Sequence, residues 1–101
     1  MTLYKIIILE CAISDIAEGC LFYNKKVSGL GFEFEDEVFK LIDVIKTNPY
    51  LFPIKFAIIH EAVLSRFPFV INYELYGKQI ILSAVFHVKQ NPIKKTKRIR
   101  K

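Results

Sequence analysis

The stretch Phe69–His87 reads FVINYELYGKQIILSAVFH, and it decides the fold. Valine, isoleucine, phenylalanine and tyrosine dominate both of its halves, which is the composition of buried β-strands. Tyr76-Gly77-Lys78 separates Phe69–Leu75 from Gln79–His87, and a glycine between two such runs is typical of a tight turn. The stretch therefore predicts two antiparallel strands joined as a hairpin.

Two further strands are predicted outward from this hairpin. Phe56–Arg66 is another apolar run rich in branched residues, and Phe67-Pro68 interrupts the chain before the hairpin begins. Proline cannot donate a hydrogen bond to a central ladder, so the chain is expected to turn there. Near the N-terminus, Tyr4–Leu9 consists mainly of isoleucine and leucine and predicts a short buried strand.

Between the first two predicted strands, apolar residues recur with helical periodicity. They predict an amphipathic helix from about Ala12 to Lys26 and a second one that ends near Thr47-Asn48-Pro49. Ser28-Gly29-Leu30-Gly31 separates the helices, which are therefore expected to pack antiparallel as a hairpin. The predicted fold is α+β, with the order β-α-α-β-β-β. The helix hairpin is expected on one face of a twisted, mostly antiparallel four-stranded sheet.

The composition favours one folded domain with a basic end. Of the 101 residues, 52% are hydrophobic, and no apolar run approaches the ~20 residues that a membrane span needs. We expect a single domain over residues 1–92 and a basic tail over residues 93–101. From Lys89 onward there are seven basic residues and no acidic ones, so residues 1–88 carry a net charge of about −2. Such a tail binds polyanions or stays solvated.

The same features favour a cytoplasmic protein that needs no cofactor, metal or small-molecule ligand. The apolar run near the N-terminus is too short for a secretory signal. Cys11 and Cys20 lie roughly 13 Å apart on the first predicted helix, which is too far for a disulfide. No further ligand stands at the spacing of a zinc site.

Three aromatic residues fall away from the apolar stripes of the two helices: Phe22, Phe32 and Phe39. If all three are exposed on one hairpin, they form a patch of the kind that marks a partner site. The alternative is that they pack against Tyr50, Phe52 or the chain termini.

The order and spacing of several short motifs resemble RelE/ParE-type toxins, and the ParE-like branch most closely. The most specific stretch is Arg66-Phe67-Pro68-Phe69 with Ile71 and Tyr73. The resemblance extends from residue 4 to about residue 92. Its other parts are Ala12 with Asp15-Ile16, Phe22-Tyr23, Gly29-Leu30-Gly31 with Phe34, Glu37-Val38, Asn48-Pro49, Phe52-Pro53, Ile80 to Ala84-Val85, His87 and Pro92.

This resemblance implies the toxin half of a bacterial type II toxin–antitoxin system, of the kind that stabilises plasmids. Members are held silent by a cognate antitoxin, which wraps a helix or an extended segment over the toxin. ParE-like members are associated with poisoning DNA gyrase, and RelE-like members cleave mRNA in the ribosomal A site. Many antitoxins repress their own operon with the toxin as co-repressor, so contact with operator DNA is expected only through the antitoxin.

The sequence departs from the family pattern where catalysis is expected. Family members often carry arginines where His60 and Glu61 stand, and an aromatic residue shortly after the position of Pro92. If the chain is a metal-independent endoribonuclease, His87 and His60 are the candidate acid–base groups, because a histidine pKa lies near working pH. Arg66 is then expected to hold phosphate, and Glu61 to orient a histidine or act as a base.

Neighbours on a strand point to opposite faces, so His60 and Glu61 share a site only if a bulge intervenes.

A gyrase poison needs no catalytic group, only a complementary and basic surface. Three hypotheses therefore stand: a binding toxin, a ribosome-dependent endoribonuclease, and an inactive toxin-like interaction module. The residues expected to meet the target or its nucleic acid are Arg66, Lys89, Lys94, Lys95, Lys97, Arg98 and Arg100.

Overall fold

The chain runs from one strand through two helices into four further strands over residues 4–89, which a computed structural model describes. The helices are close to prediction, since α1 starts two residues earlier than expected and α2 ends at Thr47. The elements are β1 (Lys5–Ile8), α1 (Glu10–Lys26), α2 (Leu30–Thr47), β2 (Ile54–Phe56), β3 (Ile59–Val63), β4 (Phe69–Tyr76) and β5 (Gln79–His87).

The strands form one mixed sheet in the order β1-β5-β4-β3-β2. β1 lies parallel to β5, with Ile7 opposite Ile81, and every other neighbouring pair is antiparallel. β4 and β5 form the central hairpin that the Tyr76-Gly77-Lys78 turn predicted. A register shift between Asn72 and Tyr73 leaves Ser83 as an extra residue on β5.

The predicted α+β fold is confirmed, but the sheet of the described chain has five strands instead of four. The single strand expected over Phe56–Arg66 is divided by a turn at Ala57 and Ile58, and the chain before that turn pairs as the edge strand β2. Ala57 has a φ of 53°, in the left-handed region. Glycine or asparagine usually occupies such a position. Because alanine stands there instead, the apolar run gave no sign of a turn in the sequence.

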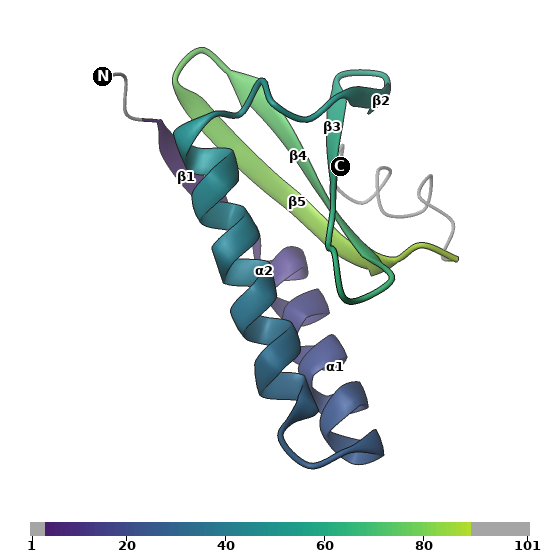
Figure 1. The fold of residues 1–101 in the computed structure, drawn as a ribbon. Coiled ribbons are helices and arrows are strands. Elements are labelled where there is room, and N and C mark those ends of the chain that lie inside the picture. The colour runs from purple at the N-terminus through teal and green to yellow at the C-terminus, as the bar shows by residue number, and fades with distance from the viewer. Residues whose placement is uncertain (1–3, 90–101) are drawn as a thin grey trace.

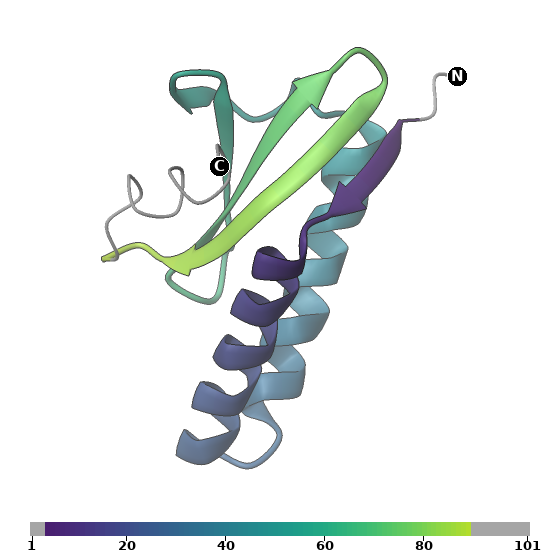
Figure 2. The same cartoon turned by 180° about the vertical axis from the view of Figure 1, so that it is seen from behind.

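Both helices lie on the same side of the sheet, and their hairpin extends beyond its edge (Figures 1 and 2). The strand side chains alternate accordingly. Ile71, Tyr73, Leu82 and Val85 belong to the main core beneath the helices. Within residues 4–89, no helix has the length and apolarity that a membrane crossing requires.

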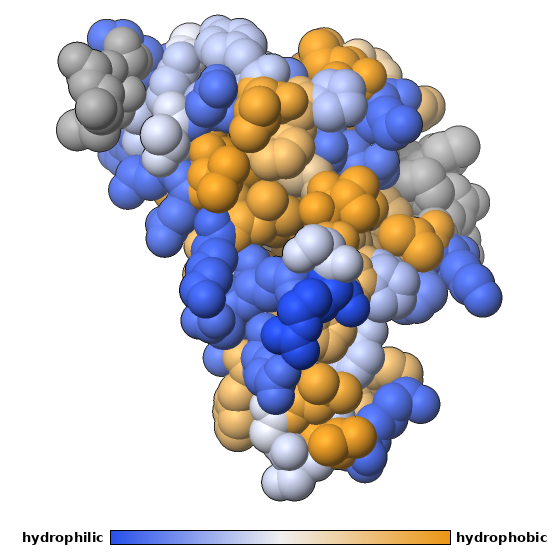
Figure 3. Space-filling view, in the orientation of Figure 1, coloured by the Kyte–Doolittle hydropathy of each residue, from blue (hydrophilic) through white to orange (hydrophobic). Residues whose placement is uncertain are grey.

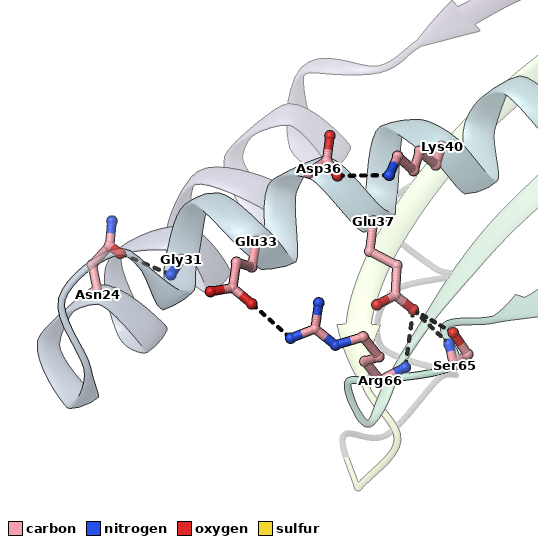
Figure 4. Close-up of polar contacts among 8 residues, drawn as sticks. All are labelled: Asn24, Gly31, Glu33, Asp36, Glu37, Lys40, Ser65 and Arg66. Carbon is pink, nitrogen blue, oxygen red and sulfur yellow. Dashed lines mark hydrogen bonds and ion pairs between the residues drawn. The ribbon is translucent and has the colours of Figure 1, made fainter.

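The two helices approach closely because glycines stand where they cross. A Cβ added to Gly31 would overlap the backbone oxygen of Cys20 on α1, and one added to Gly19 would lie 2.6 Å from the Phe34 ring. The backbone N–H of Gly31 also donates to the Asn24 side-chain oxygen at 2.7 Å, which fastens the start of α2 to the end of α1 (Figure 4).

Four aromatic rings join the hairpin to the sheet. Tyr23 of α1 and Phe34 of α2 pack against Phe67 and Phe69, with ring centroids between 4.8 and 6.0 Å apart. Most of these pairs meet edge to face, the arrangement that the charge distribution of aromatic rings favours. The cluster lies at the end of the sheet where β3 leads into β4, so it fixes the angle between the hairpin and the strands.

Replacing Gly31 by alanine should destabilise the fold more than the same change at Gly29. The added methyl group at position 31 meets the Cys20 backbone, which cannot rotate away, and the expected loss in unfolding free energy is about 3 kcal/mol. Gly29 has a φ of 88° but open space around it, so only backbone strain of about 1 kcal/mol is expected. Urea unfolding of both variants measures the difference. Equal losses would contradict the close helix contact.

Candidate functional site

A cleft of about 430 Å³ opens between α1 and the end of β5. Its floor and walls combine apolar, acidic and basic side chains, which suits an amphipathic segment of a partner protein better than a small apolar ligand. The residues that line it are Asp15, Glu18, Gly19, Phe22, Phe69, Val85, His87 and Lys89.

Helical and strand periodicities bring these residues together. Asp15, Gly19 and Phe22 lie four and seven positions apart, on one side of α1. Val85 and His87 are two apart and therefore face the same side of β5. Asp15 is 5% exposed, and its carboxylate accepts the Val85 backbone N–H at 3.0 Å, so it fastens the helix to the strand.

His87 stands at the mouth of this cleft. Its ring contacts Phe69 with centroids 5.4 Å apart, and its Nδ1 accepts the backbone N–H of Lys89 at 3.1 Å. An accepting Nδ1 leaves Nε2 to carry the proton of the neutral ring. A histidine beside a lysine in an open cleft can move a proton or bind an anion.

His60 has a different environment. It is 8% exposed and stacks on the ring of Tyr73, with centroids 4.9 Å apart. Its Nδ1 lies 2.8 Å from the Phe52 carbonyl oxygen, which can only accept, so this nitrogen carries the proton. Beside it, the Tyr73 hydroxyl donates to the Pro49 carbonyl at 2.6 Å, and burial raises the pKa of Tyr73 to about 12.

The strand register separates the two histidines. His60 lies opposite Tyr73, whereas His87 lies opposite Phe69, so the two are offset by roughly 13 Å along the strand direction and also lie two strands apart. Glu61 pairs with Asn72 and points to the sheet face away from the helices, as strand alternation requires. No bulge on β3 brings Glu61 beside His60. The candidate acid–base residues therefore do not meet at one point.

Arg66 is held against α2 (Figure 4). Its guanidinium forms an ion pair with Glu33 at 2.6 Å and lies 5.3 Å from the centre of the Phe67 ring. The hydrogen bond to Glu33 raises the pKa of Arg66 further above its usual range. The structure thus gives Arg66 a role in joining the β3–β4 loop to α2, on the other flank of the hairpin from the cleft.

Glu37 completes this junction. One of its oxygens accepts the backbone N–H of Ser65 at 2.6 Å, the Ser65 hydroxyl at 3.0 Å and the backbone N–H of Arg66 at 3.0 Å. Partial burial acts to raise the pKa of Glu37, but these hydrogen bonds and the charge of Arg66 outweigh it. The net effect is a pKa below the ordinary glutamate value.

The three aromatics of the hairpin are exposed, but they do not line one cleft. Phe22 is 50% exposed and lines the cleft, with the Lys26 ammonium 4.9 Å from its ring centre. Phe32 and Phe39 are 65% and 46% exposed and lie seven residues apart on one side of α2. Figure 3 shows apolar surface at the far end of the hairpin, separated by a hydrophilic band from apolar surface nearer the sheet.

Other site predictions fall partly or wholly outside residues 4–89. Lys89 is described and lines the cleft, whereas Lys94, Lys95, Lys97, Arg98 and Arg100 lie outside the described residues. Sequence analysis missed Asp15 and Glu18. The spacing of Asp15, Gly19 and Phe22 on one side of a predicted helix was the signal that could have identified this wall of the cleft.

The fold and the cleft define a small α+β protein with a helical hairpin on one face of a mixed sheet and a cleft between α1 and the end of β5. No family model matches the sequence, and no curated protein matches it. Among solved structures, it is similar to a chain described as the chromosomal ParDE TA system from P. aeruginosa, with a TM-score of 0.76 and 12% sequence identity. The match covers 84% of this chain and 96% of that chain, so the chain has the RelE/ParE-like fold that its motifs predicted.

Replacing Glu37 by glutamine should weaken the junction between α2 and the β3–β4 loop. At neutral pH we expect a loss of about 1.5 kcal/mol in unfolding free energy, because three donors lose their charged acceptor. A lowered folded-state pKa contributes stability above the unfolded pKa of about 4.3, and this stability is lost as pH falls through the folded value. The difference in unfolding free energy between wild type and variant should therefore become smaller at acid pH.

Denaturant unfolding at a series of pH values measures this gap. Asp36→Asn is the control, since Asp36 forms an exposed pair with Lys40 at 3.1 Å, of the kind that contributes a few tenths of a kcal/mol (Figure 4). If the difference in unfolding free energy stays constant from pH 7 to acid pH, the charge of Glu37 is not what stabilises the junction.

Proposed function

We propose that this chain is the toxin of a type II toxin–antitoxin system, of the ParE-like kind, and that it acts by binding its target. One observation carries the proposal: the hairpin and sheet of this chain superpose on nearly the whole of a ParDE-system chain, with a TM-score of 0.76. The motifs around Arg66-Phe67-Pro68-Phe69 support it, because they form the loop and the aromatic cluster on which this arrangement depends.

The positions of the acid–base candidates favour binding over catalysis. RNA cleavage without a metal needs a base, an acid and cations around one phosphate. In the described chain, His60 is buried against Tyr73, His87 lies at the far end of the sheet, and Arg66 is paired with Glu33. A binding toxin needs none of these groups to meet, so we propose DNA gyrase as its target.

One observation supports a second candidate function. His87 and Lys89 line an open cleft together, and a histidine beside a cation is the smallest unit that could assist cleavage of a phosphodiester. This arrangement supports the alternative of a RelE-like, ribosome-dependent endoribonuclease.

We place the antitoxin on the hairpin side of the molecule. Phe22 and Phe69 offer apolar surface in the cleft, and Asp15 and Glu18 add negative charge beside it. An antitoxin segment that alternates apolar and basic side chains is complementary to this lining. Phe32 and Phe39 extend apolar surface along α2, where a longer segment would continue.

Expression in a bacterium should arrest growth, induce the DNA-damage response and trap gyrase on cleaved DNA. The wild-type chain and His87→Ala should act equally, because a binding toxin needs no proton transfer. Growth, a damage-response reporter and gyrase cleavage complexes are measured after induction, together with mRNA cleavage on ribosomes. Cleavage in the A site that disappears in His87→Ala would establish the nuclease instead. Unchanged growth would indicate that the chain is an inactive toxin-like interaction module.

Phe22→Asp and Phe39→Asp should each weaken binding of the antitoxin by at least about tenfold, because a charge replaces apolar contact area. The antitoxin to test is the product of the reading frame that adjoins this one. Both side chains are about half exposed, so thermal stability should not change. Calorimetric titration measures affinity, and Tyr50→Asp is the control, since Tyr50 is an exposed aromatic that belongs to neither helix. A lower melting temperature would assign the aromatic to the core instead.

A further inference from the structure

Both helices lie on one face of the sheet, so the hairpin has an outer side that the strands do not cover (Figures 1 and 2). On α1, Ile13, Ala17 and Leu21 follow one another at four-residue steps and therefore lie along one side of that helix. All three are exposed, Leu21 by 63%. On α2, Phe32 and Phe39 form a similar exposed stripe, since seven residues separate them.

The two stripes lie on the same side of the hairpin, because the contact between the helices separates each stripe from the core. The helices meet where Gly31 of α2 approaches the Cys20 backbone of α1. Around α1, helical spacing puts Cys20 between the buried Ile16 and the exposed Ala17. Around α2, the same spacing puts Gly31 between the core side and Phe39. Together the stripes form an apolar patch of the kind that marks a partner site. We call this patch the outer face, and its residues are Ile13, Ala17, Leu21, Phe32 and Phe39.

A carboxylate stands among these apolar side chains. Glu35 is one helical turn from Gly31, so it lies at the contact between the helices and is partly buried there. Burial and, after it, the charge of Glu35 raise the pKa of the Cys20 thiol, which agrees with this position beside α1. The ion pairs within residues 4–89 belong to Glu33 and Asp36 instead. A partly buried carboxylate is stabilised by a cation, so the outer face is suited to a cation that a partner supplies.

The net charge of the hairpin favours the same kind of partner. Residues 10–47 contain eight acidic and four basic residues, so the hairpin carries a net charge of −4 in a chain whose total is +5. A second copy of the chain would set two acidic hairpins and their Glu35 carboxylates against each other, which opposes a dimer through this face. A segment rich in lysine or arginine is attracted instead.

The dimensions of the outer face fit a helix. Two packed antiparallel helices leave a groove between their ridges of side chains, and a third helix can pack along it. The stripe from Ile13 to Leu21 spans roughly 12 Å, or about two helical turns. An amphipathic helix presents apolar residues at this spacing and can place one cation among them.

We propose that the outer face binds a cationic amphipathic helix of a partner protein, whose apolar side chains cover the exposed stripes and whose lysine or arginine pairs with Glu35. The inference rests on the proposed function for the identity of this partner, which is then the antitoxin. The residues of the outer face belong to α1 and α2 alone, and none of them lines the cleft between α1 and β5.

Two synthetic peptides test the charge pairing. Each is an amphipathic helix of roughly 18 residues with leucines along one side. The residue at the centre of that side is lysine in one peptide and glutamate in the other, and the two are otherwise identical. Fluorescence anisotropy with the purified chain measures both affinities. The lysine peptide should bind at least about tenfold more tightly, because the glutamate peptide brings a second carboxylate to Glu35. Equal affinities, or no binding of the lysine peptide, would overturn the proposal.

A matched pair of variants locates the pairing on the chain. Glu35→Lys should reverse the preference, so that the glutamate peptide binds more tightly. Glu18→Lys changes the net charge by the same amount on the cleft side of α1, and it should keep the preference for the lysine peptide. If Glu35→Lys lowers the melting temperature, Glu35→Gln replaces it and should bring the two affinities together. An unchanged preference in the folded variant would show that the peptide binds elsewhere, against the proposal.

The two cysteines report where the lysine peptide lies. Cys20 lies at the helix contact beside the outer face, whereas the Cys11 thiol donates to the Ser83 carbonyl of β5 at 3.3 Å. Alkylation by iodoacetamide is followed at each cysteine by mass spectrometry. Saturating lysine peptide should slow alkylation of Cys20 severalfold and leave that of Cys11 unchanged. Protection of Cys11 without Cys20 would place the peptide against β5 and would contradict the assignment.

Sedimentation velocity tests a second copy of the chain as the occupant. The purified chain should sediment as a monomer at the concentrations used for binding. A dimer that Phe39→Asp dissociates would show that a neighbouring molecule covers the outer face, and the proposal would then be wrong.

The growth assay separates this inference from the proposed function. Growth arrest by a chain that does not bind the lysine peptide would overturn the inference and leave the toxin function standing. Binding by a chain that leaves growth unchanged would support the outer face as a helix site and overturn the antitoxin as its occupant.

Discussion

Edge-to-face packing of Tyr23 and Phe34 on Phe67 and Phe69 is the contact on which the rest of the molecule depends. These rings join the helix layer to the sheet at one end of the shared core. The hairpin is therefore fixed there and extends past the strands. Gly19 makes room for the Phe34 ring, so a small residue on α1 is as necessary to the cluster as the rings themselves.

Carboxylates anchor each helix to the backbone of the sheet region. Asp15 accepts an N–H from Val85 on one flank of the hairpin, and Glu37 accepts from Ser65 and Arg66 on the other. Charge-assisted hydrogen bonds of this kind are directional, so they define where the layers meet, whereas apolar packing alone tolerates sliding. The cleft beside Phe22 exists because Asp15 holds α1 at this position.

Periodicity predicted the helices, the central hairpin and their layering, because burial on one side imposes a regular pattern on the sequence. It did not predict β2, since the turn at Ala57 uses a backbone conformation that alanine does not signal. The arrangement of the site residues was harder to predict from the sequence, for a different reason. His60 and His87 were both placed on strands, but only the register shows that they face Tyr73 and Phe69 at separate levels. The partnership of Arg66 with Glu33 spans 33 positions and has no local pattern.

The parallel pairing of β1 with β5 joins the first strand of the domain to the last. During synthesis, Ile7 cannot pair until Ile81 has been made, so the sheet cannot be completed until β5 has left the ribosomal exit tunnel. Such long-range closure raises the contact order and slows folding. The helix hairpin, whose contacts are local, can form early, while the apolar side of β1 stays exposed until β5 is available to pair with it. A nascent chain of this fold can thus have a folded hairpin before it has a finished sheet.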